Sequence, residues 1–385
     1  MKQSLSSADS WRSLTVLTAW AFCGLSLVVV PQVGFAQAIA PSPQETSAPS
    51  SPPEINSQAL FPIWVDGKFG FIDAAGAIVI APQFDSVLSF SEPGELPNGL
   101  QLAPVQVGFQ WGYIDTTGAI VIEPQFDGTG SFSEGLAVVA IAGRTGYINS
   151  SGAIAIPIER DPVLFADMET FSEGLVVIRQ GELYGYMNAQ GEIAIAPQFE
   201  LAGPFSEGLA WVVVDGKVGY IDQTGTMVIQ PQFSPALLFP AGNFSEGLAW
   251  VMSNGRIGYI SPTGQFAIPP QFEFGTAADF SEGLAAAALY ETSLQGYIDR
   301  TGTFVIPPQF SLAGAFNEGL APVFEDFPNT QNGTQAMYIN PAGQVILRPQ
   351  AQHLGNFIHG VAWISGTEGS GYIDRTGQWI WQLGN

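Results

Sequence analysis

The sequence predicts an all-β protein, a tandem array of about nine three-stranded antiparallel meander repeats. A Gly-aromatic-Ile phrase recurs every 34 to 42 residues, and a period of this size indicates one supersecondary unit copied in tandem. The composition, with 27 Phe, 45 Gly and 28 Pro but only 12% charged residues, is typical of strands and turns. A second phrase, Phe-Ser-Glu-Gly-Leu, recurs at Phe132–Leu136, Phe171–Leu175, Phe205–Leu209, Phe244–Leu248 and Phe280–Leu284.

The fifth unit shows most clearly how each copy is expected to fold. Residues 209–214 form a first apolar strand, and Asp215-Gly216 is a tight-turn dipeptide that leads into a second strand at 218–221. A four-residue turn then precedes a third strand at 226–229. Pro231 should end this strand, because proline has no N–H for a ladder hydrogen bond. The sequence from there to the next Phe-Ser-Glu-Gly phrase is a connection between units.

The turn before the third strand has a recurring Asp-x-x-Gly-like pattern. In the fifth unit Asp222 can accept backbone N–H bonds and Gly225 can supply a positive φ. Gly264 and Gly302 end the corresponding turns of later units. We therefore interpret Asp222, Gly225, Gly264 and Gly302 as structural turn residues.

The arrangement of the units follows from their strands, which are almost continuously apolar. This pattern predicts that both faces of each meander are covered by the neighbouring units. Stacked units of this kind can remain open, as a solenoid, or close into a propeller-like ring. Nine copies at unequal spacings favour the open, solenoid-like stack, with the closed ring as the alternative.

The N-terminal part of the chain differs from the repeats. Residues 1–38 are interpreted as a secretory signal peptide, since Lys2 and Arg12 precede an apolar stretch and a small-residue Ala36-Gln37-Ala38 pattern. An uncleaved membrane anchor is the minor alternative. Residues 39–58 are a Pro- and Ser-rich linker expected to be disordered, and 59–385 form the repeat domain. The repeats are therefore expected to be exported, to a periplasmic or extracellular location, with no membrane span in the mature chain.

The repeated phrases resemble a known family. The segment Lys217–Asp222 with Gly225 and the downstream Pro-Gln-Phe and Phe-Ser-Glu-Gly-Leu-Ala phrases is similar to the WG repeat, also called the KWG repeat, of bacterial secreted and envelope proteins. Trp111-Gly112 retains the dipeptide that names the family, and the resemblance extends over about residues 60–381. It implies a non-catalytic β-repeat domain that mediates interactions. The pattern is broken where Met337 replaces Gly in the eighth unit and where Pro157-Ile158 replaces Pro-Gln-Phe in the third.

Candidate chemistry is sparse. His353 and His359 lie close in the sequence but lack the cysteines or carboxylates of a zinc site, so we expect no enzyme activity, no catalytic residue and no cofactor. The repeated glutamates, including Glu207, Glu246 and Glu282, are candidate calcium ligands. The favoured interpretation is that each accepts N–H bonds within its own loop. The candidate aromatic binding residues are Trp111, Trp211, Trp250 and Trp363, for which packing between units is the favoured role.

The charge of the chain bears on its partners. Its 34 acidic and 11 basic residues give a formal charge of −23, which disfavours nucleic acid as a partner. The leading hypothesis is an exported binding scaffold for an envelope protein or a polysaccharide. The alternative is a structural spacer without a specific ligand. The sequence leaves the oligomeric state open.

Overall fold

The structure is a computed structural model that describes residues 59–383, except 161–169, 237–239, 274, 290–292 and 327–333. The chain divides into residues 1–51 and a compact unit of residues 52–385. The signal peptide expected at 1–38 and the linker expected at 39–58 lie outside the described residues. Within the described part, no helix is long and apolar enough to span a membrane.

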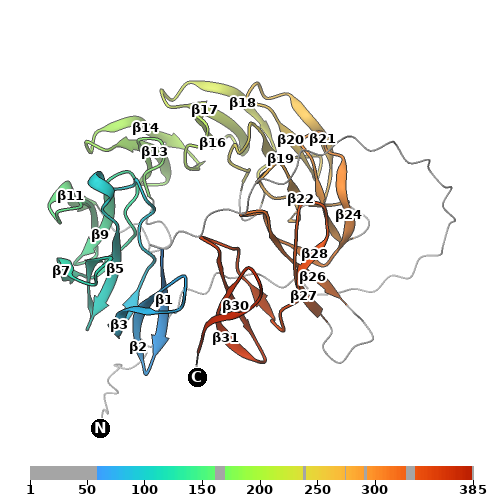
Figure 1. Cartoon of the computed structure of the whole chain (residues 1–385). Coiled ribbons are helices and arrows are strands. Elements are labelled where there is room, and N and C mark those ends of the chain that lie inside the picture. Colours follow the sequence, from blue (N-terminus) through green and yellow to red (C-terminus); the bar gives the residue numbers. More distant parts are fainter. Residues whose placement is uncertain are drawn as a thin grey trace, which may run out of the picture. The chain divides into compact units, whose positions relative to one another are not determined.

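The described residues form nine small antiparallel sheets, which we number 1 to 9 in chain order (Figure 1). Sheets 1 to 3 are β1 (Leu60–Val65), β2 (Lys68–Asp73) and β3 (Ile78–Phe84); β4 (Ser86–Val87), β5 (Leu102–Val107), β6 (Gln110–Asp115) and β7 (Ile120–Phe126); and β8 (Gly128–Thr129), β9 (Leu136–Ile141), β10 (Arg144–Asn149) and β11 (Ile154–Arg160). One 3-10 turn, η1 (Pro97–Gly99), precedes β5.

The sheets from 4 to 9 repeat this arrangement. Sheets 4 to 6 are β12 (Leu175–Gln180), β13 (Leu183–Asn188) and β14 (Ile193–Phe199); β15 (Leu201–Ala202), β16 (Leu209–Val214), β17 (Lys217–Asp222) and β18 (Met227–Phe233); and β19 (Ala249–Ser253), β20 (Arg256–Ile260) and β21 (Phe266–Phe272). Sheets 7 to 9 are β22 (Ala285–Ala288), β23 (Gln295–Ile298) and β24 (Phe304–Phe310); β25 (Leu312–Ala313), β26 (Ala321–Asp326), β27 (Thr334–Ile339) and β28 (Val345–Leu347); and β29 (His353–Leu354), β30 (Val361–Gly366), β31 (Gly369–Asp374) and β32 (Trp379–Gln382).

Each sheet contains the expected meander, and five sheets gain a short fourth strand. In sheet 5, for example, the chain leaving β14 first forms β15, which pairs with β16. The meander expectation of three strands per unit therefore describes sheets 1, 4, 6 and 7, whereas sheets 2, 3, 5, 8 and 9 have four strands. The short strand ties each connection to the sheet that follows it.

Sheet 5 shows why the third strand is longer than the sequence suggested. β18 continues through Pro231 to Phe233, so the expectation that proline ends the strand is wrong. The register shifts between the pairs Val218↔Phe233 and Tyr220↔Ile229, which places Pro231 in a bulge where no ladder N–H is needed. Gly219 makes this bulge possible, because a Cβ at that position would lie 2.6 Å from the Ile229 carbonyl oxygen.

The eighth unit lacks this glycine and supports the same role for it. Met337 is buried at the position equivalent to Gly219, and the third strand β28 is only three residues long. We infer that a side chain at this position hinders the close approach of the third strand, which ends at Leu347. In the third unit, by contrast, β11 keeps its full length and its bulge although Pro157-Ile158 replaces Pro-Gln-Phe.

Burial differs between the strands of one sheet. The first two strands are covered on both faces, as β16 and β17 show, which agrees with their continuous apolar sequence. The third strands are not covered in this way. In the third strands of sheets 1, 2 and 4 to 7 the first two residues are exposed or partly exposed, and only two positions, such as Ile80 and Phe84 in β3, are buried. The third strands β28 and β32 have no buried residue. Both-face coverage is therefore wrong for these outer strands, and their apolar pairs lie at the surface.

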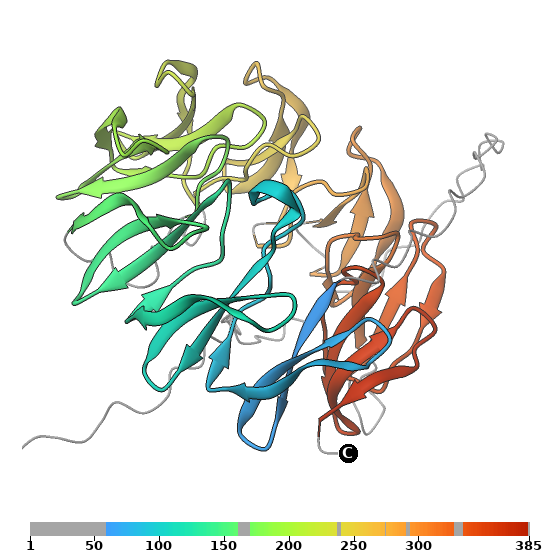
Figure 2. The same ribbon diagram turned by 60° about the vertical axis from the view of Figure 1, so that its left-hand side comes forward.

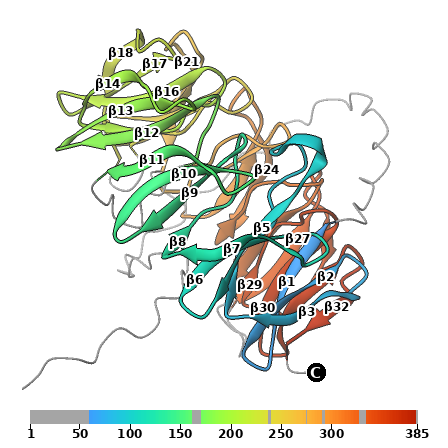
Figure 3. The same cartoon turned by 90° about the vertical axis from the view of Figure 1, so that its left-hand side faces the viewer.

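The nine sheets close into a propeller-like ring, so the expected open stack is wrong and its alternative is right. Hydrophobic clusters join each sheet to the next, and one of them joins sheet 9 to sheet 1 through Phe61, Val361 and Tyr372. The Tyr372 hydroxyl also donates a hydrogen bond of 2.9 Å to the Pro62 carbonyl oxygen. Figures 2 and 3 show β1–β3 (blue) beside β29–β32 (red). Closure buries the two sheet faces that an open stack would expose.

Candidate functional site: the Ser-Glu loops and the seam

The five Phe-Ser-Glu-Gly phrases and their two variants, Phe-Asn-Glu-Gly at 316–319 and Phe-Ile-His-Gly at 357–360, form tight hairpins. We call them the Ser-Glu loops: residues 132–136, 171–175, 205–209, 244–248, 280–284, 316–320 and 357–361. In the loop of sheet 5, Ser206 and Leu209 exchange two backbone hydrogen bonds around the Glu207-Gly208 turn. Both turn residues have positive φ, 53° and 79°. A two-residue turn of this kind favours Asn-Gly or Asp-Gly, and glutamate is strained there. The repeated glutamate therefore needs a reason beyond the turn itself.

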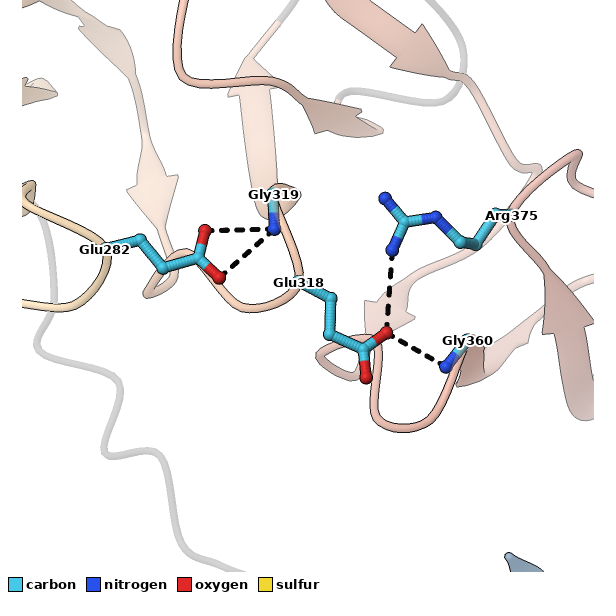
Figure 4. Close-up of polar contacts among 5 residues, drawn as sticks. All are labelled: Glu282, Glu318, Gly319, Gly360 and Arg375. Atoms are coloured by element: carbon cyan, nitrogen blue, oxygen red, sulfur yellow. Dashed lines mark hydrogen bonds and ion pairs between the residues drawn. The ribbon is translucent and has the colours of Figure 1, made fainter. Parts of the chain in front are cut away.

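The reason is a link between neighbouring loops. The carboxylate of each glutamate accepts a hydrogen bond from the glycine N–H of the next loop along the ring. Figure 4 shows Glu282 bound to the Gly319 N–H and Glu318 bound to the Gly360 N–H, each at 2.9 Å. Equivalent bonds join Glu134 to Gly174, Glu173 to Gly208, Glu207 to Gly247 and Glu246 to Gly283. The expectation that each glutamate binds within its own loop is therefore corrected: the bond crosses to the neighbouring sheet.

The serines form a second row of links in the same direction. Ser206 donates from its hydroxyl to the Phe244 carbonyl oxygen at 2.7 Å, and Ser245 donates to the Phe280 carbonyl oxygen at 2.7 Å. Ser133, Ser172 and Ser281 make the same contact with the loops that follow them. The Ser-Glu loops thus form a continuous hydrogen-bonded chain over sheets 3 to 9.

The candidate calcium ligands Glu207, Glu246 and Glu282 belong to this chain. They lie on successive sheets, and each carboxylate is directed at a glycine N–H of the next loop. In the described part of the chain, no three His, Cys, Asp or Glu side chains come together in a group that could hold a metal ion. The arrangement binds loops to loops, with backbone N–H groups in the place a cation would take.

The predicted turn residues lie at the other turn of each sheet. Asp222 accepts hydrogen bonds from the Thr224 and Thr226 N–H groups at 2.9 and 3.0 Å. The Thr224 hydroxyl, together with these N–H groups, holds the pKa of Asp222 below its usual value. Gly225, Gly264 and Gly302 have φ of 82°, 78° and 82°. Their Cα atoms also face an isoleucine side chain of the preceding sheet, which leaves little room for a Cβ.

The interface between sheets 9 and 1, which we call the seam, shows none of these loop links among the described residues. The last Ser-Glu loop has Ile358 in place of the serine and His359 in place of the glutamate, so it carries neither linking group. Across the seam the His359 Nε2 atom lies 3.6 Å from a carboxylate oxygen of Glu92, which belongs to sheet 2. This contact is an ion pair only when the imidazole is protonated. This contact therefore joins the loop of sheet 9 to the segment before sheet 2, and not to sheet 1.

In the part of the chain that the structure describes, the seam also shows no counterpart of an aromatic contact that the other interfaces share. A phenylalanine of each following loop packs on the tyrosine or phenylalanine of the sheet before it, with ring centroids 4.8–5.1 Å apart: Phe71–Phe90, Tyr113–Phe132, Tyr147–Phe171, Tyr186–Phe205, Tyr220–Phe244, Tyr259–Phe280, Tyr297–Phe316 and Tyr338–Phe357. At the seam, Tyr372 packs instead on Phe61 and Trp363. Burial raises the pKa of Tyr372, which keeps its hydroxyl protonated as a donor to Pro62.

A cavity of about 300 Å³ lies at the seam, beside Tyr372, and we call it the seam pocket. Its walls come from three sheets: residues 59–62 of sheet 1, residues 89–92 and Gln101 before sheet 2, and residues 355, 356, 358, 359, 361, 363 and 372 of sheet 9. Its size is at the lower end of the range for ligand pockets. The aromatic walls, the Glu92 carboxylate and the His359 imidazole give it both apolar and polar binding groups.

The candidate tryptophans and His359 lie in two different environments. Trp211 and Trp250 pack on the hydrophobic clusters between sheets, and Trp111 does the same in sheet 2. Trp363 is 38% exposed and lines the seam pocket, as does His359.

Other pocket residues were not predicted from the sequence. Glu92, Phe61 and Tyr372 line the seam pocket, but each belongs to a repeat position that packs or turns elsewhere in the ring. The available signal was the missing Phe-Ser-Glu-Gly phrase before Leu60, which marks sheet 1 as the unit without such a loop.

Comparison with known proteins gives a family and a fold. The model of the WG containing repeat matches residues 69–108, 111–144, 146–184, 184–217, 219–256, 257–289 and 296–326, which is more than half of the chain. No curated protein matches the sequence. A solved structure of a eukaryotic initiation factor is similar with a TM-score of 0.59, at 13% identity over 84% of this chain and 95% of the other. The dihydro-heme d1 dehydrogenase NirN matches less closely, with a TM-score of 0.41 at 14% identity over 78% and 75% of the two chains. Virginiamycin B lyase from Staphylococcus aureus has a TM-score of 0.33 at 15% identity, over 61% and 92%.

Proposed function

Because this chain belongs to the family of WG containing repeat proteins and its repeats close into a ring, we propose that it is an exported, non-catalytic binding scaffold of the cell envelope. The observation that carries the proposal is the seam pocket. The repeated Ser and Glu side chains are engaged in links between loops, so they hold the ring together. At the seam these links are replaced by a cavity with aromatic, carboxylate and imidazole groups. Such a mixture fixes a ligand by apolar contact and orients it by polar contact.

A protein partner is favoured over a polysaccharide. The pocket lies where every described neighbouring interface places a phenylalanine side chain from a polypeptide loop. The surroundings are therefore those of a site that accepts a peptide segment. A structural spacer without a ligand is the second candidate, and the continuous row of linked loops over sheets 3 to 9 supports it.

The test compares capture of envelope proteins by the wild type and by a variant with a blocked pocket. Ser89 is exposed and lines the pocket, so Ser89→Trp should fill it without disturbing the core. Thr170→Trp is the matched control, since Thr170 is exposed and precedes Phe171 as Ser89 precedes Phe90. The proposal expects partners that wild type and Thr170→Trp retain and Ser89→Trp loses. The same set of captured proteins for all three chains would favour the spacer, and selective loss of a bound polysaccharide would replace the protein partner.

A further inference from the structure

We propose that the seam pocket of one molecule receives the Phe109 side chain of a second copy of this chain, so that the rings associate head to tail. This inference rests on the proposed function, because it names the partner of the same pocket. It is supported by two independent features of the chain, a site shaped for a phenylalanine and a phenylalanine with no role in its own ring.

The shape of the site follows from the repeat. Leu60 opens β1 in the register in which Leu209 opens β16. Counting back along the sequence, Asn56 stands where the loop of sheet 5 has Phe205. Phe205 packs on Tyr186 with ring centroids 4.8 Å apart, and Tyr372 is the equivalent of Tyr186 at the seam. The pocket beside Tyr372 therefore corresponds to the place of a phenylalanine that sheet 1 does not encode.

The segment that precedes sheet 1 in the sequence does not supply this ring. Residues 36–58 contain no Phe, Tyr or Trp. An aromatic occupant of the pocket must then come from outside this segment, and a second copy of the chain is one source.

Phe109 is the complementary feature. It is 93% exposed, the largest exposure among the large hydrophobic residues of the described chain. It lies in the two-residue turn between β5 and β6, where Val107 pairs with Gln110. The equivalent turns of sheets 1 and 5 contain Asp66-Gly67 and Asp215-Gly216, which suit such turns by themselves. A phenylalanine adds nothing to the turn and exposes apolar surface, which marks a contact surface.

The two features lie at opposite ends of the same strands. Leu102, at the start of β5, accepts a backbone hydrogen bond from Ser91, which lines the seam pocket. Phe109 follows the other end of β5. One molecule therefore cannot fill its own pocket with its own turn. A contact between unlike surfaces of identical chains is heterologous, and it continues from copy to copy unless the rotation closes it.

Charged residues near the Phe109 turn and the seam pocket favour the contact between two copies, whereas the net charge of each copy opposes it. Beside the Phe109 turn, Asp85 accepts from the Gly108 N–H at 2.7 Å and binds the Lys68 ammonium at 2.6 Å. Lys68 is thus held near the turn, and Glu92, with a side chain 66% exposed, lines the pocket. The formal charge of −23 on each copy repels the other, so association should strengthen as salt screens it.

Sedimentation velocity of residues 52–385, which form a compact unit, tests the proposal. In about 0.5 M salt the weight-average mass of the wild type should rise with concentration. Phe109→Gln and Ser89→Trp should each remain monomeric. An equimolar mixture of the two variants should form a 1:1 dimer and nothing larger, because only one intact pocket and one intact Phe109 remain to pair. Thr170→Trp and Ile193→Gln, which add or remove exposed apolar surface elsewhere, should associate like the wild type.

Several outcomes would overturn the proposal. A wild type that stays monomeric at all concentrations excludes self-association. Equal association of wild type and both variants excludes this pair of surfaces, and so does a mixture that stays monomeric. A monomeric wild type whose envelope partners are still lost in Ser89→Trp would overturn this inference alone and leave the proposed function standing. Melting temperatures of the variants close to that of the wild type show that they are folded.

Discussion

Among single residues, Asp279 is unusual for a carboxylate of the ring. It precedes Phe280 and is accessible to solvent, but protein surrounds most of its side chain. This desolvation raises the pKa of Asp279 to about 6, although a hydrogen bond from Trp250 acts in the opposite direction. Four carboxylates of the Asp-x-x-Gly turns, those of Asp115, Asp222, Asp299 and Asp374, have lowered pKa values instead. The two kinds of aspartate should therefore respond to pH with opposite signs.

Asp279→Asn should stabilise the protein more at pH 7.5 than at pH 4. The folded pKa of Asp279 lies above the ordinary value of 3.8, so the unfolded chain loses its proton first as pH rises. The contribution of Asp279 to stability is therefore present below about pH 4 and is lost as pH rises through about 6. Thermal melts of wild type and variant at both pH values measure the difference. An equal change in melting temperature at both values would show that Asp279 titrates normally.

The turn glycines separate backbone strain from packing between sheets. Gly302 and Gly135 have almost the same φ, 82° and 84°. A Cβ on Gly302 would lie 2.5 Å from the Ile268 side chain, whereas nothing lies within 4 Å of one on Gly135. We expect Gly135→Ala to cost about 1 kcal/mol from strain and Gly302→Ala to cost at least about 2 kcal/mol, because crowding adds to strain. Urea unfolding of both variants gives the two values. Equal losses would mean that the close contact between sheets does not exist.

Among the elements, the Ser-Glu loops explain how identical units are held in a fixed relation. The loops at 171–175, 205–209, 244–248 and 280–284 are each bound by the Ser and Glu side chains of the loop before and bind the loop after in the same way, whereas the loop at 316–320 binds the next one through Glu318. Arg375 adds to this at sheet 9, where its guanidinium lies 3.5 Å from the Glu318 carboxylate (Figure 4). The strained glutamates persist because their side chains reach the next sheet, which Asn or Asp is too short to do.

The loop link predicts how substitutions at Glu207 rank. Glu207→Gln keeps an oxygen that can accept from the Gly247 N–H, so it should cost less than about 1 kcal/mol. Glu207→Ala leaves that N–H without its partner and should cost about 1–2 kcal/mol. Glu92→Ala is the comparison, because in the loop of sheet 2 the Glu95 carboxylate, and not that of Glu92, accepts from the next loop. Denaturant unfolding measures all three. A loss for Glu92→Ala as large as that for Glu207→Ala would contradict the link.

Calcium gives an independent test of the same carboxylates. Hydrogen-bonded links predict that millimolar Ca²⁺ changes the melting temperature no more than Mg²⁺ does. A specific site occupied at about 100 times its dissociation constant would add about 2.7 kcal/mol to the native state. A Ca²⁺-selective increase that disappears in the Glu207→Gln, Glu246→Gln, Glu282→Gln triple variant would make these residues metal ligands.

In the molecule as a whole, the repeated phrases predict most of the fold but do not predict whether the sheets close into a ring. The periodic phrases located the strands of sheet 5 to within a few residues, and Asp222 and Gly225 identified its second turn. The bulge at Pro231 was missed because it depends on a backbone contact with Gly219 in another strand. Closure depends on the small angle between successive sheets, summed over the ring, which no single repeat encodes. The seam pocket was missed for the same reason, since it arises only where the first and last sheets meet.

A closed ring requires that sheets 9 and 1 meet as interior neighbours do, and the distance between them can be measured. Residues 52–385 contain no cysteine, so pairs introduced there can carry spin labels. Ala77 and Gln378 are exposed and occupy equivalent positions in sheets 1 and 9, and Ala119 is the exposed equivalent in sheet 2. By pulsed electron paramagnetic resonance, the seam pair Ala77→Cys with Gln378→Cys should give the same short, narrow distance distribution as the interior pair Ala77→Cys with Ala119→Cys. A long or broad distribution for the seam pair alone, beside a short one for the interior pair, would contradict the closed ring.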